Sequence, residues 1–77
     1  MSDEVILVDA TGLKCPLPVL KARKAIKNLK NGEEIRVIST DQASPIDFKH
    51  FCNSNGHKLI EINQKEDRFE FLIKKME

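Results

Sequence analysis

The segment with the clearest chemical potential is Cys15-Pro16-Leu17-Pro18, a thiol followed by two closely spaced prolines. Proline is tolerated in the first turn of a helix, where its missing N–H would have no intrahelical partner. We therefore predict that a helix begins at Pro16, with Cys15 as its N-cap and Pro18 inside the first turn. The helix dipole and Lys14 would then favour the nucleophilic thiolate. The alternative is that Cys15 is an ordinary small apolar residue.

The other groups with chemical potential are weaker candidates. Cys52 follows Phe51 on the expected apolar side of a second helix, which favours a buried inert thiol over a resolving or second carrier thiol. His50 and His57, taken with the two cysteines, match no zinc-binding spacing, so we expect no metal site and no cofactor. The sequence establishes no nucleophile–base pair with Cys15.

Size and composition limit the class of protein. The 77 residues are expected to form one domain over 1–77, whose small core stabilises the fold by about 3–5 kcal/mol. Two distant cysteines make no disulfide framework, which indicates a reduced, cytoplasmic protein. No signal sequence is expected, and no apolar run approaches the roughly 20 residues that would span a bilayer, so we expect no membrane insertion.

Hydrophobic periodicity predicts six elements that must position Cys15. The aliphatic run over residues 5–8 indicates a strand buried on both faces, and a turn containing Gly12 leads from it to the cysteine. The second helix is expected to direct four side chains inward: Ile46, Phe48, Phe51 and Cys52. The other elements are a helix over 17–29 that stops at Asn31-Gly32, a strand over 34–40, a helix from a capping Ser44 and Pro45 to Asn55-Gly56, and strands over 58–63 and 68–74 joined by a loop over 64–67.

The element order β-α-β-α-β-β predicts an α/β (α+β) two-layer sandwich. The strand–helix–strand unit favours a right-handed crossover between parallel strands, and the short last loop favours an antiparallel pair. We expect a four-stranded mixed sheet with two helices on one face. On the open face, Leu72 with Ile38 or Leu59 would form either a mild apolar patch or scattered surface aliphatics.

Positive charge is concentrated on the first helix, although the net charge of the chain is only +1. Three interpretations remain open: a solvated helix face, a surface that steers an acidic partner protein, or direct binding of tRNA. The absence of Tyr and Trp disfavours RNA binding, because no stacking platform is available. The basic residues of this stretch are Lys14, Lys21, Arg23, Lys24, Lys27 and Lys30.

Two motifs flank the basic helix: Asp9-x-x-Gly12-Leu13-x-Cys15-Pro16-x-Pro18 and Asp41-x-Ala43-x-x-x-Asp47-x-x-x-Phe51-Cys52. In this order they resemble the TusA/SirA-like sulfur-carrier family with its Cys-Pro-x-Pro motif, over nearly the whole chain. The resemblance implies that Cys15 accepts sulfane sulfur as a persulfide and transfers it, without acting as a stand-alone enzyme. It also implies a sulfur donor protein, typically a cysteine desulfurase, and a downstream acceptor, for example in a relay that forms 2-thiouridine in tRNA.

The resemblance also assigns supporting residues. Pro16 and Pro18 carry over as a rigid mount for Cys15, within a motif that includes Gly12 and Leu13. If the basic stretch steers a partner protein, the expected contacts are Lys14, Lys21, Arg23, Lys24 and Lys27. Asp41 and Asp47 carry over as capping or partner-contact residues without proton chemistry. The best-known tRNA-relay members have an Arg-Asp-Ile-Pro run where this chain has Ile46-Asp47-Phe48-Lys49, which leaves the downstream partner open. The competing hypotheses are a non-catalytic regulatory or binding module and a thiol redox protein.

Overall fold

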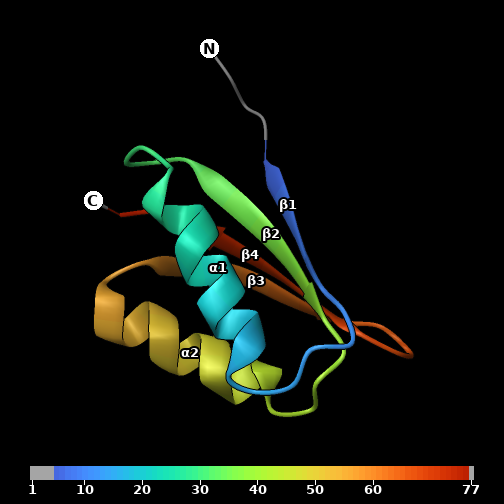
Figure 1. The fold of residues 1–77 in the computed structure, drawn as a ribbon. Helices are drawn as coiled ribbons and strands as arrows, with labels where there is room; N and C mark the ends of the chain where they lie inside the picture. Colours follow the sequence, from blue (N-terminus) through green and yellow to red (C-terminus); the bar gives the residue numbers. More distant parts are fainter. Residues whose placement is uncertain (1–4, 77) are drawn as a thin grey trace.

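Six elements follow one another along residues 5–76, the part of the chain that the computed structural model describes (Figure 1). Both helices lie on one face of a four-stranded mixed sheet, as the sequence predicted. Among residues 5–76, no helix is both long and apolar enough to cross a membrane. The elements are β1 (Ile6–Ala10), α1 (Leu17–Lys27), β2 (Glu34–Ser39), α2 (Ser44–Asn55), β3 (Lys58–Gln64) and β4 (Phe69–Lys74).

The sheet has the strand order β1-β2-β4-β3. The crossover through α1 makes β1 parallel to β2, and β4 lies antiparallel between β2 and β3. In register, Val8 pairs with Val37, and Val37 pairs with Phe71. Since side chains alternate between the two faces of a strand, these three residues lie on the face that the helices cover.

The core lies between the helices and this face of the sheet. The ring of Phe48 on α2 stacks on that of Phe71 on β4, with 4.5 Å between their centroids, and both side chains are fully buried. Ile35 and Ile73 are equally buried beside them. Each such side chain contributes about 1.5–3 kcal/mol by leaving water, so the packing of α2 against β4 largely determines where α2 lies.

The prediction that the first strand is buried on both faces is wrong. Val8 and Ala10 are buried, but Leu7 is 60% exposed and Val5 and Ile6 are also exposed. The reason is topological, because β1 is an edge strand and the helices cover only one face of the sheet. A run of aliphatic residues does not distinguish a central strand from an edge strand.

Two details of the helices also differ from the predictions. Ile46 is 67% exposed, because the inward side of α2 is formed by Ser44, Phe48, Phe51 and Cys52 at helical spacing. Ser44 is not a cap; its hydroxyl bonds with that of Ser39 inside the protein, and Ala43 takes the N-cap position.

Helix α1 ends two residues earlier than predicted. Its last residue is Lys27, because the N–H groups of Asn28 and Leu29 bond to carbonyls three residues back and tighten the final turn. The predicted stop of α2 is confirmed, since Gly56 follows the helix in a left-handed conformation with φ of 75°.

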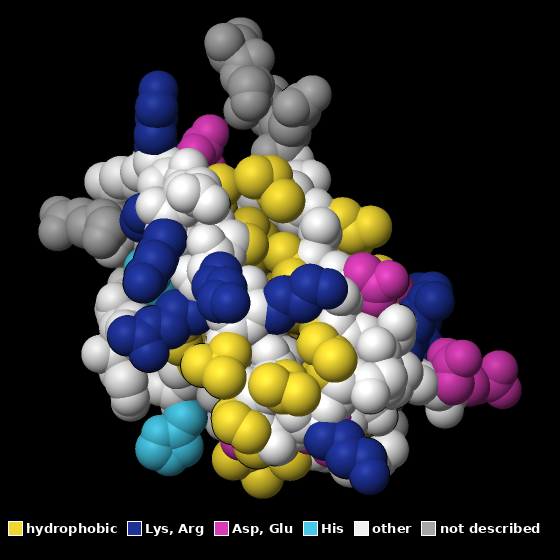
Figure 2. Space-filling model, viewed as in Figure 1, with side chains coloured by type: hydrophobic (Ala, Val, Ile, Leu, Met, Phe, Trp, Pro, Cys, Tyr) yellow, Lys and Arg dark blue, Asp and Glu magenta, His cyan; other side chains and the backbone are white. Residues whose placement is uncertain are grey.

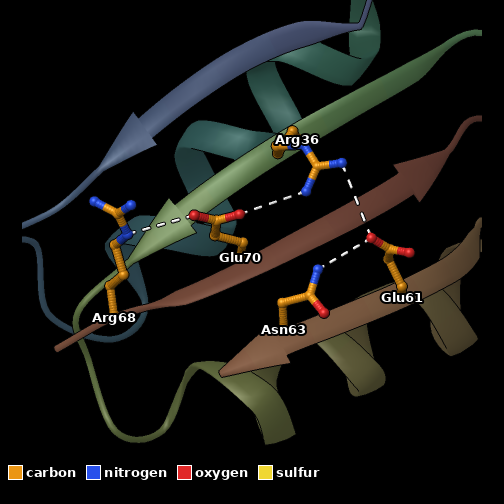
Figure 3. Close-up of polar contacts among 5 residues, drawn as sticks. All are labelled: Arg36, Glu61, Asn63, Arg68 and Glu70. Carbon is orange, nitrogen blue, oxygen red and sulfur yellow. Dashed lines mark hydrogen bonds and ion pairs between the residues drawn. The ribbon is translucent and has the colours of Figure 1, made fainter. Parts of the chain in front are cut away.

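The face of the sheet away from the helices carries a network of charges (Figure 3). Arg36 lies 3.5 Å from Glu70 and 3.9 Å from Glu61, and Arg68 lies 3.4 Å from Glu70. The Asn63 amide donates a hydrogen bond to Glu61. These partly exposed ion pairs contribute little stability individually, about 0–1 kcal/mol.

The sequence leaves open whether this face carries an apolar patch or scattered aliphatic side chains, and the charged network favours the second. Leu72 and Ile38 are half-buried and lie opposite Arg36 and Glu70 in the strand register. Leu59 instead packs against the core, so its assignment to the open face is wrong. The open face is therefore mainly polar, with scattered aliphatic side chains.

Candidate functional site

The exposed thiol of Cys15 lies on the loop between β1 and α1, one residue before the helix cap. The N-cap is Pro16, because its carbonyl accepts the first intrahelical hydrogen bond, from the N–H of Leu20 at 3.1 Å. The prediction that Cys15 is the cap is therefore wrong by one residue. A turn closed by the N–H of Leu17 and the carbonyl of Lys14 contains Cys15 and precedes the helix. Pro18 occupies the first turn, as predicted, and is buried.

Hydrogen bonds hold the loop before Cys15 in place. The Asp9 carboxylate accepts bonds from the N–H and hydroxyl of Thr11, at 3.0 and 2.8 Å. Gly12 adopts φ of 79°, which favours glycine, and its N–H donates to the hydroxyl of Thr40 at 2.9 Å. The N–H of Leu13 closes the turn onto the carbonyl of Ala10. The Gly12-Leu13 part of the motif therefore forms the turn that leads to the cysteine.

Asp41 fastens Cys15 to the loop between β2 and α2. Its carboxylate accepts a hydrogen bond of 2.7 Å from the backbone N–H of Cys15, across 26 residues of sequence. The other carboxylate oxygen lies 3.5 Å from the N–H of Ala43, and the N–H of Asp41 donates to the hydroxyl of Ser39. A bond to a charged acceptor is stronger than one between neutral groups. Asp41 therefore positions the cysteine backbone.

Asp47, in the first turn of α2, acts on the thiol itself. Hydrogen bonding of the thiol to its carboxylate is the main cause that raises the pKa of Cys15. Partial desolvation and the negative charges of Asp47 and Asp41 raise this pKa further. The prediction that the helix terminus and Lys14 favour the thiolate in the free protein is therefore wrong, because the nearby carboxylates favour the neutral thiol.

Cys15, Asp41 and Asp47 form a compact hydrogen-bonded group. Their sulfur and carboxylate oxygen atoms lie within 4.8 Å of one another, a distance at which three ligands can also hold a metal ion. Asp41, however, already accepts the N–H of Cys15, and Asp47 raises the pKa of the thiol. We interpret the group as a means of holding the thiol in place and protonated.

The thiol borders an open groove of about 300 Å³ between α1 and α2. Pro16, Val19 and Phe51 provide its apolar surface. Its polar side chains come from one side of α2: Asp47, His50, Ser54 and Asn55. The spacing of Asp47, His50 and Ser54 by three, four and seven residues shows in the sequence that they share one side of a helix. The sequence does not show that this side faces Cys15 and α1.

The basic residues of α1 and its preceding loop lie on different parts of the surface. Lys14 is exposed beside Cys15, and the amino group of Lys21 donates to the carbonyl of Asp9. Lys21 and Lys24 border an apolar depression of about 270 Å³ formed by three leucines, Leu13, Leu17 and Leu20. Arg23 and Lys27 face the other side of the helix, toward α2. Figure 2 shows Lys and Arg side chains in a band across this face, with hydrophobic side chains above and below it.

The family of the chain follows from comparison with known proteins. A family model described as sulfurtransferase TusA matches residues 6–75. The chain belongs to the TusA family. This confirms the resemblance seen in the two motifs.

Individual relatives of this TusA-family chain agree with the assignment. It is 43% identical over 68 residues to the sulfur carrier protein TusA of Allochromatium vinosum, covering 88% of this chain and 90% of the relative. It is 38% identical over 69 residues to the sulfur carrier protein TusA of Pseudomonas putida, covering 90% and 86%. The crystal structure of a SirA-like protein from Desulfitobacterium hafniense superposes with a TM-score of 0.83 and 28% identity, covering 95% of this chain and all of the other.

The second cysteine of this TusA-family chain has a different environment. Cys52 is 3% exposed within the core, and burial raises its pKa to about 11. Both cysteines are free thiols. Burial supports the interpretation of Cys52 as an inert apolar residue, since a resolving thiol must be accessible.

Sequence reasoning missed several residues around the site. His57, in the α2–β3 turn, and Lys75, directly after β4, line one groove with Arg23 and Lys27. No local pattern in the sequence connects the end of β4 with the middle of α1. The closeness of Asp47 to the thiol was missed for the same reason.

Proposed function

We propose that this protein is a sulfur carrier that accepts sulfane sulfur as a persulfide on Cys15 and passes it to the thiol of an acceptor protein. One observation carries the proposal: in a chain of the TusA family, the motif cysteine is exposed at the rim of an open groove on a loop held by hydrogen bonds. An accessible sulfur on a rigid mount can approach a second protein with little loss of conformational entropy.

The transfer is a pair of sulfur exchanges. The Cys15 thiolate attacks the terminal sulfur of the donor persulfide, the bond between the two donor sulfurs breaks, and the donor thiolate takes the proton that Cys15 has lost. Cys15 then holds the terminal sulfur as a persulfide. In the second step an acceptor thiolate attacks that terminal sulfur and Cys15 leaves as a thiolate. No external oxidant or reductant is needed for either exchange.

The raised pKa of Cys15 gives the donor a part in the first step. In the free protein Asp47 raises the pKa of Cys15, which lowers the fraction of nucleophilic thiolate. A donor that brings a cation or an N–H donor to Asp47 compensates its charge and releases the thiolate. The carrier then reacts mainly when a partner is bound.

Partner contact is proposed for the surface around the thiol. Leu17 and Leu20 are nearly half exposed beside the Cys15 loop, and Lys14 and Lys24 lie at the edge of these leucines. An apolar centre with a charged rim is typical of protein interfaces. The donor is of the cysteine desulfurase class or another persulfide enzyme, and tRNA thiolation is one of the pathways that such a carrier serves.

The proposal is tested by intact-protein mass after incubation with a cysteine desulfurase and free cysteine. The native chain should gain one sulfur, Cys52→Ser should gain it equally, and Cys15→Ser should gain none. Because two oxygens weigh nearly the same as one sulfur, each sample is measured again after a reducing thiol, which removes a persulfide and leaves a sulfinate. A reducible gain that survives in Cys15→Ser, or no gain with several desulfurases, would overturn the proposal.

A further inference from the structure

The groove beside Cys15 continues along the protein beyond the thiol. A second open groove of about 270 Å³ lies between the same two helices, and Phe51 and Asn55 line both. The two are therefore adjoining parts of one groove between α1 and α2, which we call the interhelical groove. One end contains Cys15, and the other contains Arg23 and Lys75.

The two ends carry opposite charge. At the thiol end the carboxylate of Asp47 lines the groove, with that of Asp41 within 4.8 Å of it. Among residues 5–76, those that line the far end include no acidic residue and four basic ones: Arg23, Lys27, His57 and Lys75. The interhelical groove is thus polarised along its length.

The cations of the far end are available to a ligand. Within residues 5–76, no ion pair or hydrogen bond engages the side chains of Arg23 or Lys27. Lys75 donates to the carbonyl of Leu29, and no carboxylate of the described part of the chain forms an ion pair with it. Burial, followed by the positive charge of Lys75, lowers the pKa of His57.

The middle of the interhelical groove is apolar. Val19 and Phe51 lie between the charged ends, with Pro16 on the thiol side and Ile26 on the far side. Asn55 lines both parts of the groove, and its side-chain amide donates a 2.9 Å hydrogen bond to the carbonyl of Phe51. This middle part suits a short stretch of small or apolar residues, while the ends select charges.

We propose that the interhelical groove binds an extended segment of a sulfur-transfer partner and orients it by the order of its charges. The partner's reactive cysteine, next to a basic residue, lies at the Cys15 end, and an acidic residue a few positions away lies between Arg23 and Lys75. This inference rests on the proposed function. The opposite order would place acid against Asp47 and base against Arg23, and like charges at close range are repelled.

The test uses synthetic peptides whose cysteine is activated as a mixed disulfide with thionitrobenzoate. The Cys15 thiolate attacks the peptide sulfur, the sulfur–sulfur bond breaks, and coloured thionitrobenzoate leaves, so absorbance gives the rate. Lys-Cys-Gly-Ala-Ala-Gly-Glu has the matching charge order, and Glu-Cys-Gly-Ala-Ala-Gly-Lys has the opposite order. Both are also made in reversed sequence, because the groove does not define chain direction. The rate of each peptide with the protein is divided by the rate of the same peptide with the small thiol N-acetylcysteine. This ratio removes differences in the intrinsic reactivity of the four peptide disulfides.

The expected result is a preference of about tenfold for the matching charge order in one chain direction, with a rate that saturates as peptide is added. Arg23→Glu combined with Lys27→Glu should abolish or invert the preference. Lys49→Glu makes one matched charge change on α2, and Lys49 lines neither part of the groove, so this variant should retain the preference. Equal normalised rates for all four peptides would overturn the proposal. The proposal would also be overturned if Lys49→Glu reduced the preference as much, per charge changed, as the double variant does. That result would mean that the overall charge of the surface, and not the groove, selects the peptide.

The peptide test and the persulfide test fail separately. The peptides carry ordinary disulfides, so they report on the interhelical groove whether or not Cys15 ever holds a persulfide. A charge-order preference without persulfide formation would overturn the carrier function and keep the groove as a peptide site. Persulfide formation without a charge-order preference would overturn the proposed role of the groove and leave the carrier function intact.

Discussion

Cys15 and Cys52 both have a raised pKa, but the two thiols owe it to different surroundings. Cys15 is exposed on a loop, and the bond to the carboxylate of Asp47 keeps its proton in place. Cys52 is buried on the inner side of α2, and the cost of charging a group away from water raises its pKa to about 11. One effect comes from a neighbouring charge and the other from the absence of solvent.

The difference determines which thiol a partner can activate. A charge effect is reversed when a cation approaches Asp47, and Cys15 lies where a partner can provide one. A burial effect is reversed only by opening the core, which costs the packing of α2 against the sheet. The same direction of pKa shift thus marks a controllable nucleophile in one region and an unreactive thiol in the other.

The largest expected contrast is in alkylation of the native protein at pH 8. Cys15 should react with iodoacetamide more than about a hundredfold faster than Cys52, because a thiol with a pKa near 11 is about 0.1% thiolate at that pH and Cys52 is also buried. Peptide mapping by mass spectrometry measures both rates. In concentrated urea the two rates should become similar. Comparable rates in the native state would remove the contrast between the two regions.

Replacing each thiol by a hydroxyl should separate the regions in stability. Cys52→Ser should lower the free energy of unfolding by about 2 kcal/mol, because it buries a hydroxyl without an assured partner. Cys15→Ser should change it by less than about 0.5 kcal/mol, since Cys15 is exposed. Urea denaturation of both variants checks this. Equal losses would show that the Cys15 side chain contributes to packing.

The backbone anchor of Cys15 gives the next effect. Asp41→Ala should lower the free energy of unfolding by about 1–2 kcal/mol, because the N–H of Cys15 loses a charged acceptor. Hydrogen exchange of the Cys15 amide should accelerate by more than that of the core amide of Phe71, whose exchange follows only the loss of global stability. Asp67→Ala, in the exposed β3–β4 turn, serves as the control and should leave both quantities unchanged. Unchanged exchange at Cys15 in Asp41→Ala would contradict the anchor.

The smallest effect concerns the charge beside the thiol. Asp47→Asn should lower the pKa of Cys15, because a neutral amide no longer favours the protonated thiol. The alkylation profile of Cys15 should shift to lower pH, with a several-fold faster rate at pH 7.5 and no change at Cys52. Asp67→Asn is the matched control. A shift to higher pH would show that the raised pKa has another cause.

Much of this fold was readable from the sequence, and the misses share one cause. The element order, the alternation in β2 and β4 and the stop at Gly56 are local patterns, and all are confirmed. The misassigned residues depended on neighbours that local patterns do not contain. Leu7 is exposed because β1 lies at the edge of the sheet, and Leu59 packs inward because of its register with β4.

The site divides in the same way. The sequence by itself determined that a thiol would precede a helix with Pro18 in its first turn, because proline geometry acts within a few residues. Only the tertiary structure decided the charge around that thiol. Electrostatic interactions depend on distance in space, and the packing of Phe48 on Phe71 places α2 so that Asp47 lies against Cys15. The tertiary structure also brings Arg23 and Lys75, from distant parts of the sequence, to one groove, which gives the surface beside the thiol its two opposite ends.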